Sequence, residues 1–596
     1  RLKQAKGIMV DPETIATYHE AAKLPLIRSD SIVSRMEIVE FLREAKRAMY
    51  ANQRRHVELR QTYLEELAEA VLIQRRPWLG EEGKEQQKEE QIEKQLKELI
   101  KRENLRKMHR TIGFLLKSGR GKGLLQVDIP DIDAIPPPGE TFGDPDDPKN
   151  WRGPWISIKD PEEMAKRVAK ANIKSYHQAH PTPFCGEPLG MSLGPYAESP
   201  IADKILNGEH IPELLTENLM DETKRMLHEL GKPPPLVVHK DLKLHITMEE
   251  YKAMYKKMDE NISSSPSTRH VGHYKAATRS DTLSRLYAGM MSLPYTEGFS
   301  PARWQVSMDV MLPKEENNWR ISRLRIIQLY ESDANQSMRQ IFARQLGFIL
   351  EDSNLVPAMQ FGSRPGKMCI SPILQKILTF DIARMAKIVL ASKELDAIGC
   401  YDRIANRLGY LMCRRLGLPH TAIKSLAETW ANMVHVIRTA YGRSKSEYLS
   451  TPQVTLYGAG QGSTNGPFFW LLMFIILYDS LDPELRTLVF VCAWASVFAS
   501  RPGDSFVDDS HLGVTSSHVD DSNLSVEENY RLHELQVLED LTKLARHYER
   551  LLWSTGGALN ILKCSWVLIS WVWKNGRASL ATIDQATGTI ALTAGN

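Results

Sequence analysis

Apolar residues recur three and four positions apart through much of residues 31–120, as in SRMEIVEFLREAKRAMY and TYLEELAEAVLI. This spacing predicts amphipathic helices. Residues 81–110 are highly charged with both signs mixed, which is typical of a solvated helix or a coiled coil. The N-terminal part of the chain is therefore expected to be helical.

The helical pattern then breaks. Residues 127–151 are rich in Pro and Asp, which disfavour helix and keep a segment solvated, so they are expected to form a linker. Further on, Thr247 with Glu250 forms a capping box and predicts the start of a helix. The apolar run 467–477 is shorter than the roughly 20 residues of a membrane span, so a buried helix is expected and no membrane partner.

Three segments carry strand patterns. In IVLASKELDAIGCYDRI (388–404) an apolar stretch reaches Asp396 at its end. In SFVDDSHLGV (505–514) two short apolar runs flank Asp508 and Asp509, as in a hairpin whose turn presents both carboxylates. In WVLISWVWKNGRASL (566–580) apolar residues alternate around Asn-Gly, which predicts another hairpin. Helices and strands together indicate an α+β protein.

Composition narrows the class of protein. A chain of 596 residues with 42% hydrophobic and 25% charged residues is typical of several globular domains. The net charge of +3 gives no argument for nucleic-acid binding, so that function would need a local basic surface such as 101–122, with eight Lys or Arg and one acid.

The cysteines indicate the compartment. They are far apart in the sequence and form no C-x-x-C pair, which argues against a disulfide framework and a structural zinc site. No secretory signal is visible, so we expect an intracellular protein of the cytoplasm or nucleus. The six are Cys185, Cys369, Cys400, Cys413, Cys492 and Cys564.

The acidic residues at strand ends point to metal chemistry. Nucleotidyl transfer uses two divalent cations about 3.5–4 Å apart, and hard cations prefer carboxylate oxygens. Asp396, Asp508 and Asp509 have the expected pattern. A bare Asp-Asp pair is weak support, because the pairs 146–147 and 520–521 occur in polar loops. On these residues alone, an ordinary surface turn remains the alternative.

Several motifs in this region resemble those of reverse transcriptases, especially the non-LTR retrotransposon and group II intron types. ELDAIGCYDRI resembles their first palm motif, YGAGQGSTNGPFFW (457–470) the second and SFVDDSHL the third, in matching order and spacing. VMLPKEENNWRISRLRIIQL (310–329) and QFGSRPGKMC (360–369) resemble the fingers motifs, and GGALNILKCSW (556–566) the fourth palm motif. The resemblance covers about 240–575.

This resemblance implies a right-hand polymerase fold, with a palm built on an antiparallel sheet, and fingers, after a helical N-terminal region. A thumb normally follows the palm, and none is evident before Asn596. The expected organisation is a helical region 1–126, a linker 127–151, a mixed connecting region 152–239, fingers and fingers-palm segment 240–395, palm 396–580 and a truncated C-terminal segment 581–596.

The resemblance also implies catalytic roles. Asp396, Asp508 and Asp509 would hold two Mg²⁺ or Mn²⁺ ions. Lys563 would act as a general acid toward pyrophosphate, although a solvated Lys at a turn is nearly as good an interpretation.

Other residues would bind the nucleotide. Lys314 and Arg325 would contact the triphosphate. The family usually has Arg-Pro-Ile where this chain has Arg325-Ile326-Ile327, so Arg323 competes for that role. Gln461 and Gly462 would line the nucleotide and template pocket.

The position five residues after Asp396 separates polymerase classes. Tyr401 lies there and would exclude a 2′-hydroxyl, selecting deoxynucleotides. Asp402 is then expected to be structural, paired with Arg403 or Arg407.

The remaining candidates have structural alternatives. The hairpin in 566–580 would grip the primer end, or else belongs to the sheet core. His270, His273 and His435 have no partners at metal spacing and are interpreted as structural or surface residues.

The function implied is an RNA-directed DNA polymerase of a retroelement, with an RNA template, a DNA or RNA primer and dNTPs as partners. Two alternatives remain open. An RNA-dependent RNA polymerase shares the palm, but Tyr401 argues against it. A catalytically inactive, retroelement-derived nucleic-acid-binding protein is favoured by the absent thumb and the altered fingers motif.

Overall fold

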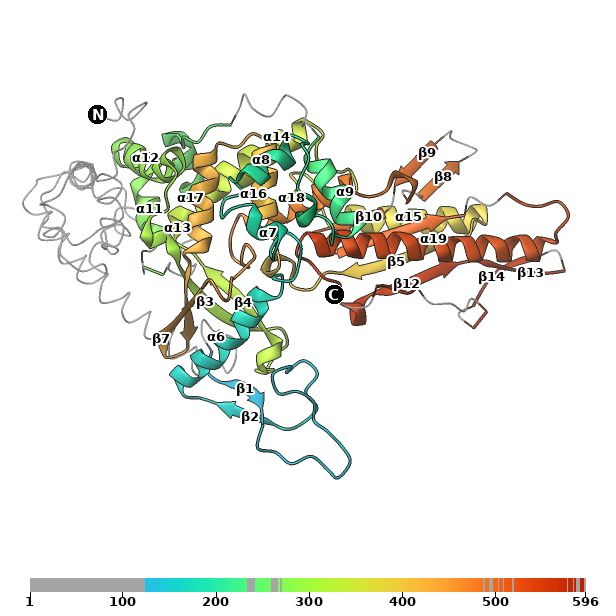
Figure 1. The fold of residues 1–596 in the computed structure, drawn as a ribbon, viewed down its shortest axis with the longest axis horizontal. Coiled ribbons are helices and arrows are strands. Elements are labelled where there is room, and N and C mark those ends of the chain that lie inside the picture. Colours follow the sequence, from blue (N-terminus) through green and yellow to red (C-terminus); the bar gives the residue numbers. More distant parts are fainter. Residues whose placement is uncertain are drawn as a thin grey trace, which may run out of the picture.

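The computed structural model is an α+β protein built of helices and several small sheets (Figure 1). It describes residues 124–232, 242–258, 266–267, 269, 271–485, 488–492, 497–501, 503–507, 509–516, 519–575, 577–582, 584–585 and 590–593, with only the backbone of 488–492 and 497–501. The expected N-terminal helices and the basic stretch 101–122 lie outside the described residues.

One antiparallel sheet carries the acidic motifs. Its strand order is β10-β11-β5-β12, where β5 is Leu390–Asp396, β10 Gly503–Phe506, β11 Asp509–Thr515 and β12 Ser565–Ile569. The expected strand ending at Asp396 and the expected hairpin in 505–514 are both confirmed, but Asp509 begins β11 opposite Phe506 and does not lie in the turn. Two long helices, α15 (Ile370–Ala386) and α19 (Val526–Ser554), run along this sheet (Figure 1).

A second sheet has the order β4-β3-β6-β7, with β3 parallel to β6 and the other pairs antiparallel. Its strands are β3 (Val306–Pro313), β4 (Leu324–Leu329), β6 (Val434–Thr439) and β7 (Gly442–Leu449). Helix α6 (Pro161–His177) packs on β6 and β7. It begins where Asp160 accepts a hydrogen bond from the Glu163 N–H and Pro161 occupies the first turn.

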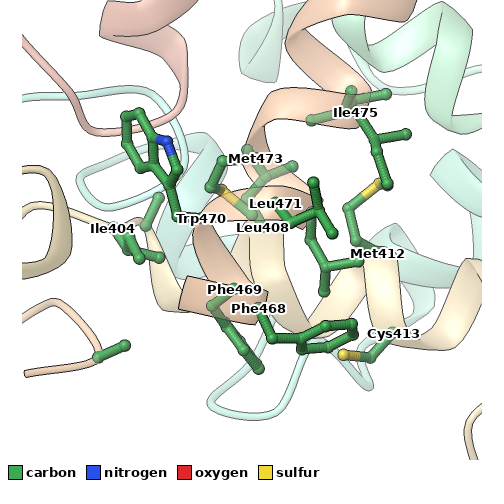
Figure 2. Packing of buried hydrophobic residues seen from close by; sticks show 14 of the residues in the cluster. Ile404, Leu408, Met412, Cys413, Phe468, Phe469, Trp470, Leu471, Met473 and Ile475 are labelled. Atoms are coloured by element: carbon green, nitrogen blue, oxygen red, sulfur yellow. The ribbon is translucent and has the colours of Figure 1, made fainter. Parts of the chain in front are cut away.

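A buried core joins α16 (Asn406–Arg415) and α18 (Gly466–Asp479), whose side chains interleave in Figure 2. Helix α18 is apolar on all sides and almost entirely buried, as expected for 467–477. The two helices approach closely at Gly409, where a Cβ would lie 2.5 Å from the Phe469 ring. No described helix has the length and apolarity that a membrane crossing requires.

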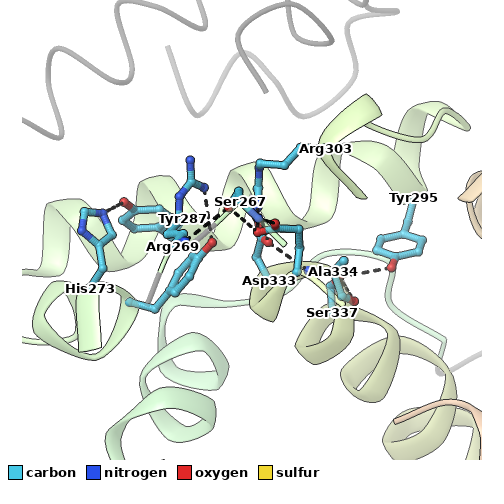
Figure 3. Close-up of polar contacts among 11 residues, drawn as sticks. Ser267, Arg269, His273, Tyr287, Tyr295, Arg303, Asp333, Ala334 and Ser337 are labelled. Atoms are coloured by element: carbon cyan, nitrogen blue, oxygen red, sulfur yellow. Dashed lines mark hydrogen bonds and ion pairs between the residues drawn. The ribbon is translucent and has the colours of Figure 1, made fainter. Parts of the chain in front are cut away.

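A helical region lies next to the second sheet in the chain. It contains α10 (Met248–Lys256), α11 (Val271–Ala277) and α12 (Asp281–Glu297), which precede β3, and α13 (Ser332–Met338), which follows β4. The expected capping box at the start of α10 is confirmed, since Thr247 and Glu250 exchange hydrogen bonds. Beside it lies the Arg303 cluster, which we define as Arg303, Glu331 and Asp333 (Arg303 and Asp333 in Figure 3).

The Arg303 cluster is buried and paired. The Arg303 guanidinium donates to Glu331 at 2.6 Å and to Asp333 at 2.9 Å, and all three side chains are less than a tenth exposed. Ser267 adds hydrogen bonds from its N–H and hydroxyl to Glu331. Nearby, the buried His273 ring contacts the Tyr287 hydroxyl at 2.7 Å (Figure 3), which agrees with the structural interpretation of His273.

The connecting regions differ from the expectation. The first residues of the expected linker form β1 (Val127–Pro130), which pairs with β2 (Trp155–Ile158), and Val127 is fully buried. In region 152–239, helix α9 (Asp221–Leu230) packs against α18 and α19, so this region belongs to the main core. Both departures arise from contacts between segments distant in the sequence, the pairing of β1 with β2 and the packing of α9 on α18 and α19. A local sequence pattern does not reveal such contacts.

The remaining described elements complete the chain. They are α7 (Leu189–Ser192), α8 (Pro200–Leu206), the π-helix Arg339–Leu346, α14 (Gly347–Asp352), α17 (His420–Ala431), β8 (Leu488–Cys492), β9 (Val497–Arg501), β13 (Trp571–Lys574) and β14 (Arg577–Leu580). Strands β13 and β14 pair as the hairpin expected around Asn575, whereas 565–569 joins the first sheet as β12.

Candidate active site

Two of the three candidate metal ligands are neighbours. Asp396 ends β5, Asp509 begins β11, and the two are directly opposite in the antiparallel register. Side chains of directly opposite residues lie on the same face of a sheet, with Cβ atoms roughly 4.5–5.5 Å apart. Asp508 lies outside the described residues and directly precedes Asp509 in the chain. The sheet therefore brings together two acids that are far apart in the sequence.

Asp396 is held by the segment that follows α19. The Asn560 side chain donates to Asp396 Oδ2 at 3.2 Å, and the Asn560 N–H donates to the Asp396 carbonyl at 2.8 Å. Lys563 Nζ lies 3.2 Å from Oδ2, with 66% of the Lys563 side chain and 25% of the Asp396 side chain exposed. Because this ion pair is open to water, it contributes little to stability and Lys563 can leave it readily.

The turn between β10 and β11 is fixed by neighbouring segments. Val507 has φ +57°, an uncommon conformation for a β-branched residue. Its carbonyl accepts hydrogen bonds from Trp470 Nε1 at 2.7 Å and from Gln360 Nε2 at 3.2 Å. Gly362 packs so closely that a Cβ there would lie 2.2 Å from the Val507 nitrogen. Strain maintained by surrounding contacts is a frequent property of functional sites.

The turn after β5 places Tyr401 and Asp402 beside the Gly-rich loop, residues 458–465. Tyr401 is half-buried, and its carbonyl accepts the Ala459 N–H at 2.9 Å. Gln461 donates from Nε2 to Asp402 Oδ2 at 3.1 Å. Burial raises the pKa of Asp402 to about 7, against the opposing effects of the Gln461 hydrogen bond and the Lys314 charge.

Asp402 is buried, as a structural role requires, but neither arginine expected as its partner is its hydrogen-bond donor. Arg403 donates to the Gly556 carbonyl at 2.9 Å and to Gln178 at 3.1 Å. Arg407 donates to the carbonyls of Gly194 and Cys185. Both arginines instead tie backbone carbonyls to the core, and the partner of Asp402 is Gln461.

A group of cations surrounds Lys314, just after β3. Partial desolvation lowers the pKa of Lys314, and the positive charges of Lys149, Arg325, Lys563 and Arg323 lower it further. Lys314 is therefore within electrostatic range of these four cations and of Asp402, and Lys563 is paired with Asp396. Such a concentration of cations favours a polyanion such as a triphosphate.

Arg325 and Arg323 differ in their partners. Arg323 lies 3.7 Å from Glu315 in an exposed ion pair. Arg325 is exposed on β4 and makes no ion pair with another of the described residues. Of the two competing candidates, Arg325 is the more available to an anionic ligand.

Gly462 is in close contact with the second sheet. It has φ +137°, and a Cβ there would lie 2.1 Å from the Gln328 carbonyl. Its own carbonyl accepts a hydrogen bond from the Asn335 side chain at 3.1 Å. Any side chain at 462 would therefore displace this loop from β4.

The β13–β14 hairpin lies beside α19 rather than at the acids. Trp573 packs on Tyr530 of α19, and Lys387 Nζ lies 5.0 Å from the centroid of the Trp573 ring. The primer-binding role of this hairpin stays a prediction.

Several residues of the site were not identified from the sequence. Asn560 lies within the fourth motif, three residues before Lys563, and this proximity was the only available indication. Gln360, Trp470 and Gln328 also lie within motifs identified above, but their contacts are with distant segments, which no local pattern reports.

The residues at the end of β5 fit a divalent cation. Like charges directly opposite each other on a sheet destabilise it, so a cation between them is favoured. Carboxylate oxygens are the appropriate donors, and Lys563 already supplies one positive charge at Asp396. Within the described part of the chain, no group of three or more His, Cys, Asp or Glu residues is close enough to hold a metal ion, and Asp508 is not in that part.

No protein-family model matches this chain, and no curated protein matches it.

Proposed function

We propose that this protein is an RNA-directed DNA polymerase of a retroelement. The observation that carries the proposal is the direct cross-strand pairing of Asp396 and Asp509 at the end of the β5–β11 ladder. These are two of the three acids expected from the motifs, and they come from segments more than a hundred residues apart. In this proposal the β10-β11-β5-β12 sheet with α15 and α19 belongs to the palm, and β3 and β4 with the preceding helices α10, α11 and α12 belong to the fingers.

The reaction would join the primer 3′-oxygen to the α-phosphorus of a dNTP and break the bond to the bridging oxygen of the leaving pyrophosphate. Asp396, Asp508 and Asp509 would hold two Mg²⁺ or Mn²⁺ ions. When bound, these ions would activate the 3′-hydroxyl and stabilise the leaving group.

The cations around Lys314 would bind the triphosphate. Lys314 and Arg325 would neutralise phosphoryl oxygens, because negative charge develops there in the transition state. Lys563, which lies beside Asp396, is near enough to the acids to give a proton to pyrophosphate as it leaves.

Primer extension on an RNA template with dNTPs and Mg²⁺ tests the proposal. The parent should extend the primer, and Asp509→Asn should lower the rate by about 100-fold or more, because one carboxylate ligand is lost. Asp520→Asn is the matched control, since it alters an exposed acid of the Asp520-Asp521 pair. Equal extension by the parent and by Asp509→Asn would mean that this site does not catalyse polymerisation.

Sugar discrimination is assigned to Tyr401, which lies at the turn between Asp396 and the Gly-rich loop. Tyr401→Val should increase NTP incorporation relative to dNTP incorporation, because the ring that clashes with a 2′-hydroxyl is removed. An unchanged ratio would reject this assignment, and preferential NTP use by the parent would instead identify an RNA-dependent RNA polymerase.

A further inference from the structure

Gln328 on β4 lies directly under the Gly-rich loop of residues 458–465. Its N–H donates to the Gln461 carbonyl at 2.8 Å. A Cβ at Gly460 would lie 1.5 Å from Gln328 Oε1, and a Cβ at Gly462 would lie 2.1 Å from the Gln328 carbonyl. Both the backbone and the side chain of Gln328 are therefore in close contact with this loop.

The Gln328 side chain is itself held at both ends. It is 3% exposed, its Oε1 accepts a hydrogen bond from the Tyr330 hydroxyl, and its Nε2 lies 3.2 Å from His435 Nδ1. The same Tyr330 hydroxyl lies 3.5 Å from the Ala459 carbonyl. A buried amide with both ends engaged has one orientation, and changing it leaves polar partners unsatisfied.

The network continues into the second sheet. His435 Nδ1 lies 3.4 Å from Oδ1 of Asp309, which is fully buried. Tyr448 donates its hydroxyl proton to the other oxygen of Asp309 and also contacts the Asn172 amide of α6 at 3.1 Å. Because Nδ1 carries either a lone pair or a proton, it bonds to Gln328 or to Asp309 but not to both at once. The link from Gln328 to Tyr448, Asp309 and α6 is completed by the stacking of the His435 ring on Tyr448, with ring centroids 4.7 Å apart.

The loop also contacts the segment that follows Asp396, through the side chain of Gln461. Gln461, whose carbonyl is bound by Gln328, donates its side-chain amide to Asp402 at 3.1 Å. Asp402 is in the 3₁₀ turn Cys400–Asp402, shortly after β5 ends at Asp396. The loop is therefore fixed between the second sheet and the acidic site.

We propose that Gln328 is a positioning residue that holds the Gly-rich loop in place and thereby sets the affinity for the incoming nucleotide. The nucleotide part of this inference rests on the proposed polymerase function. Gln328 would act through Gln461, which faces the nucleotide in that function, and would take no part in the chemical step.

The test compares two buried glutamines. Gln328→Met removes the polar groups under the loop at similar side-chain length. Gln340→Met is the matched control, because Gln340 is 5% exposed and its amide donates to Glu250, in the helical region away from the loop. Tyr330→Phe is a milder second variant, which removes only the hydroxyl group that contacts Gln328 and the loop.

The first readout is backbone hydrogen exchange of residues 458–465, which needs no activity. Gln328→Met should speed exchange there by about tenfold, Tyr330→Phe by about threefold, and Gln340→Met should leave it unchanged. Unchanged exchange in both loop variants, or an equal effect of Gln340→Met, would overturn the positioning role.

The second readout separates binding from chemistry. Gln328→Met should raise the KM for dNTP by about tenfold while kcat changes less than about threefold. A fall in kcat with KM unchanged would overturn the assignment to nucleotide affinity. If the parent shows no polymerisation dependent on Asp509, the proposed function and this nucleotide part fail together, whereas the exchange measurement still decides whether Gln328 positions the loop.

Discussion

Two groups of acids in this molecule have opposite surroundings. In the Arg303 cluster, Glu331 and Asp333 are buried and share one guanidinium, whereas Asp396 is at the end of strand β5 beside a largely exposed lysine. Burial tends to raise the pKa of Asp333, but the charge and hydrogen bonds of Arg303 lower it overall. The first arrangement fixes charge permanently, and the second leaves acids accessible to a ligand.

The comparison teaches how to separate structural acids from functional ones. A buried acid with a complete set of partners is costly to disturb and has no capacity left for chemistry. An acid with a solvated partner can exchange that partner for another cation at little cost. Three experiments can break or sharpen this distinction.

The largest effect on stability is expected at the buried cluster. Arg303→Met should lower the free energy of unfolding by about 3–5 kcal/mol, because two acids remain buried without their cation. The control is Arg167→Met, which removes an exposed ion pair with Glu163 and should cost less than about 1 kcal/mol. Urea denaturation measures both, and equal losses would contradict the distinction.

Asp402 tests an intermediate case, a buried acid whose partner is an amide and which forms no ion pair with Arg403 or Arg407. Its pKa is about 7 in the folded protein and 3.8 in the reference state, so the folded state binds the proton more tightly. The stability from that proton is complete below about pH 4 and is lost as the pH rises through 7.

Asp402→Asn should therefore gain stability relative to the parent as the pH rises from 5 to 8, by about 2–4 kcal/mol. Urea midpoints at both pH values measure this change. The same pH dependence in the parent and the variant would show that Asp402 is already ionised in the folded protein.

The smallest effect on stability is expected at the open site. Lys563→Met should change the free energy of unfolding by less than about 1 kcal/mol, because its ion pair with Asp396 is solvated. It should nevertheless slow nucleotide incorporation by about tenfold, since a proton donor and a positive charge near the leaving group are lost. Lys543→Met, which removes an exposed pair on α19, should change neither quantity. A large loss of stability with an unchanged rate would make Lys563 a structural residue.

Local sequence patterns predicted several of the secondary-structure elements in and around the candidate site. The strand ending at Asp396, the hairpin before and after the turn at Val507, the α10 capping box and the buried helix α18 all follow from alternation, turn chemistry or continuous burial. Each depends on residues within a few positions of one another, which is why a single sequence reveals them.

Long-range partners were predicted less well. Arg403 and Arg407 were predicted as ion-pair partners of Asp402 because they are its neighbours in the chain. Its hydrogen-bond donor is instead Gln461, in a loop that is distant in the sequence. The segment expected to be a linker begins with β1, which is buried only because β2 pairs with it. The strand-end pattern pointed to a metal site at Asp396, Asp508 and Asp509, and the family resemblance implied that they meet, whereas the direct cross-strand register of Asp396 with Asp509 comes from the pairing of two segments distant in the sequence.

A double-mutant cycle of single-nucleotide incorporation at Asp396 and Asp509 tests the central claim most directly. If both carboxylates hold the same pair of ions, Asp396→Asn and Asp509→Asn should each slow incorporation by about 100-fold or more, and the double variant should be little slower than either one. A double variant whose loss is the product of the two single losses, or a single variant with the parental rate, would contradict the claim.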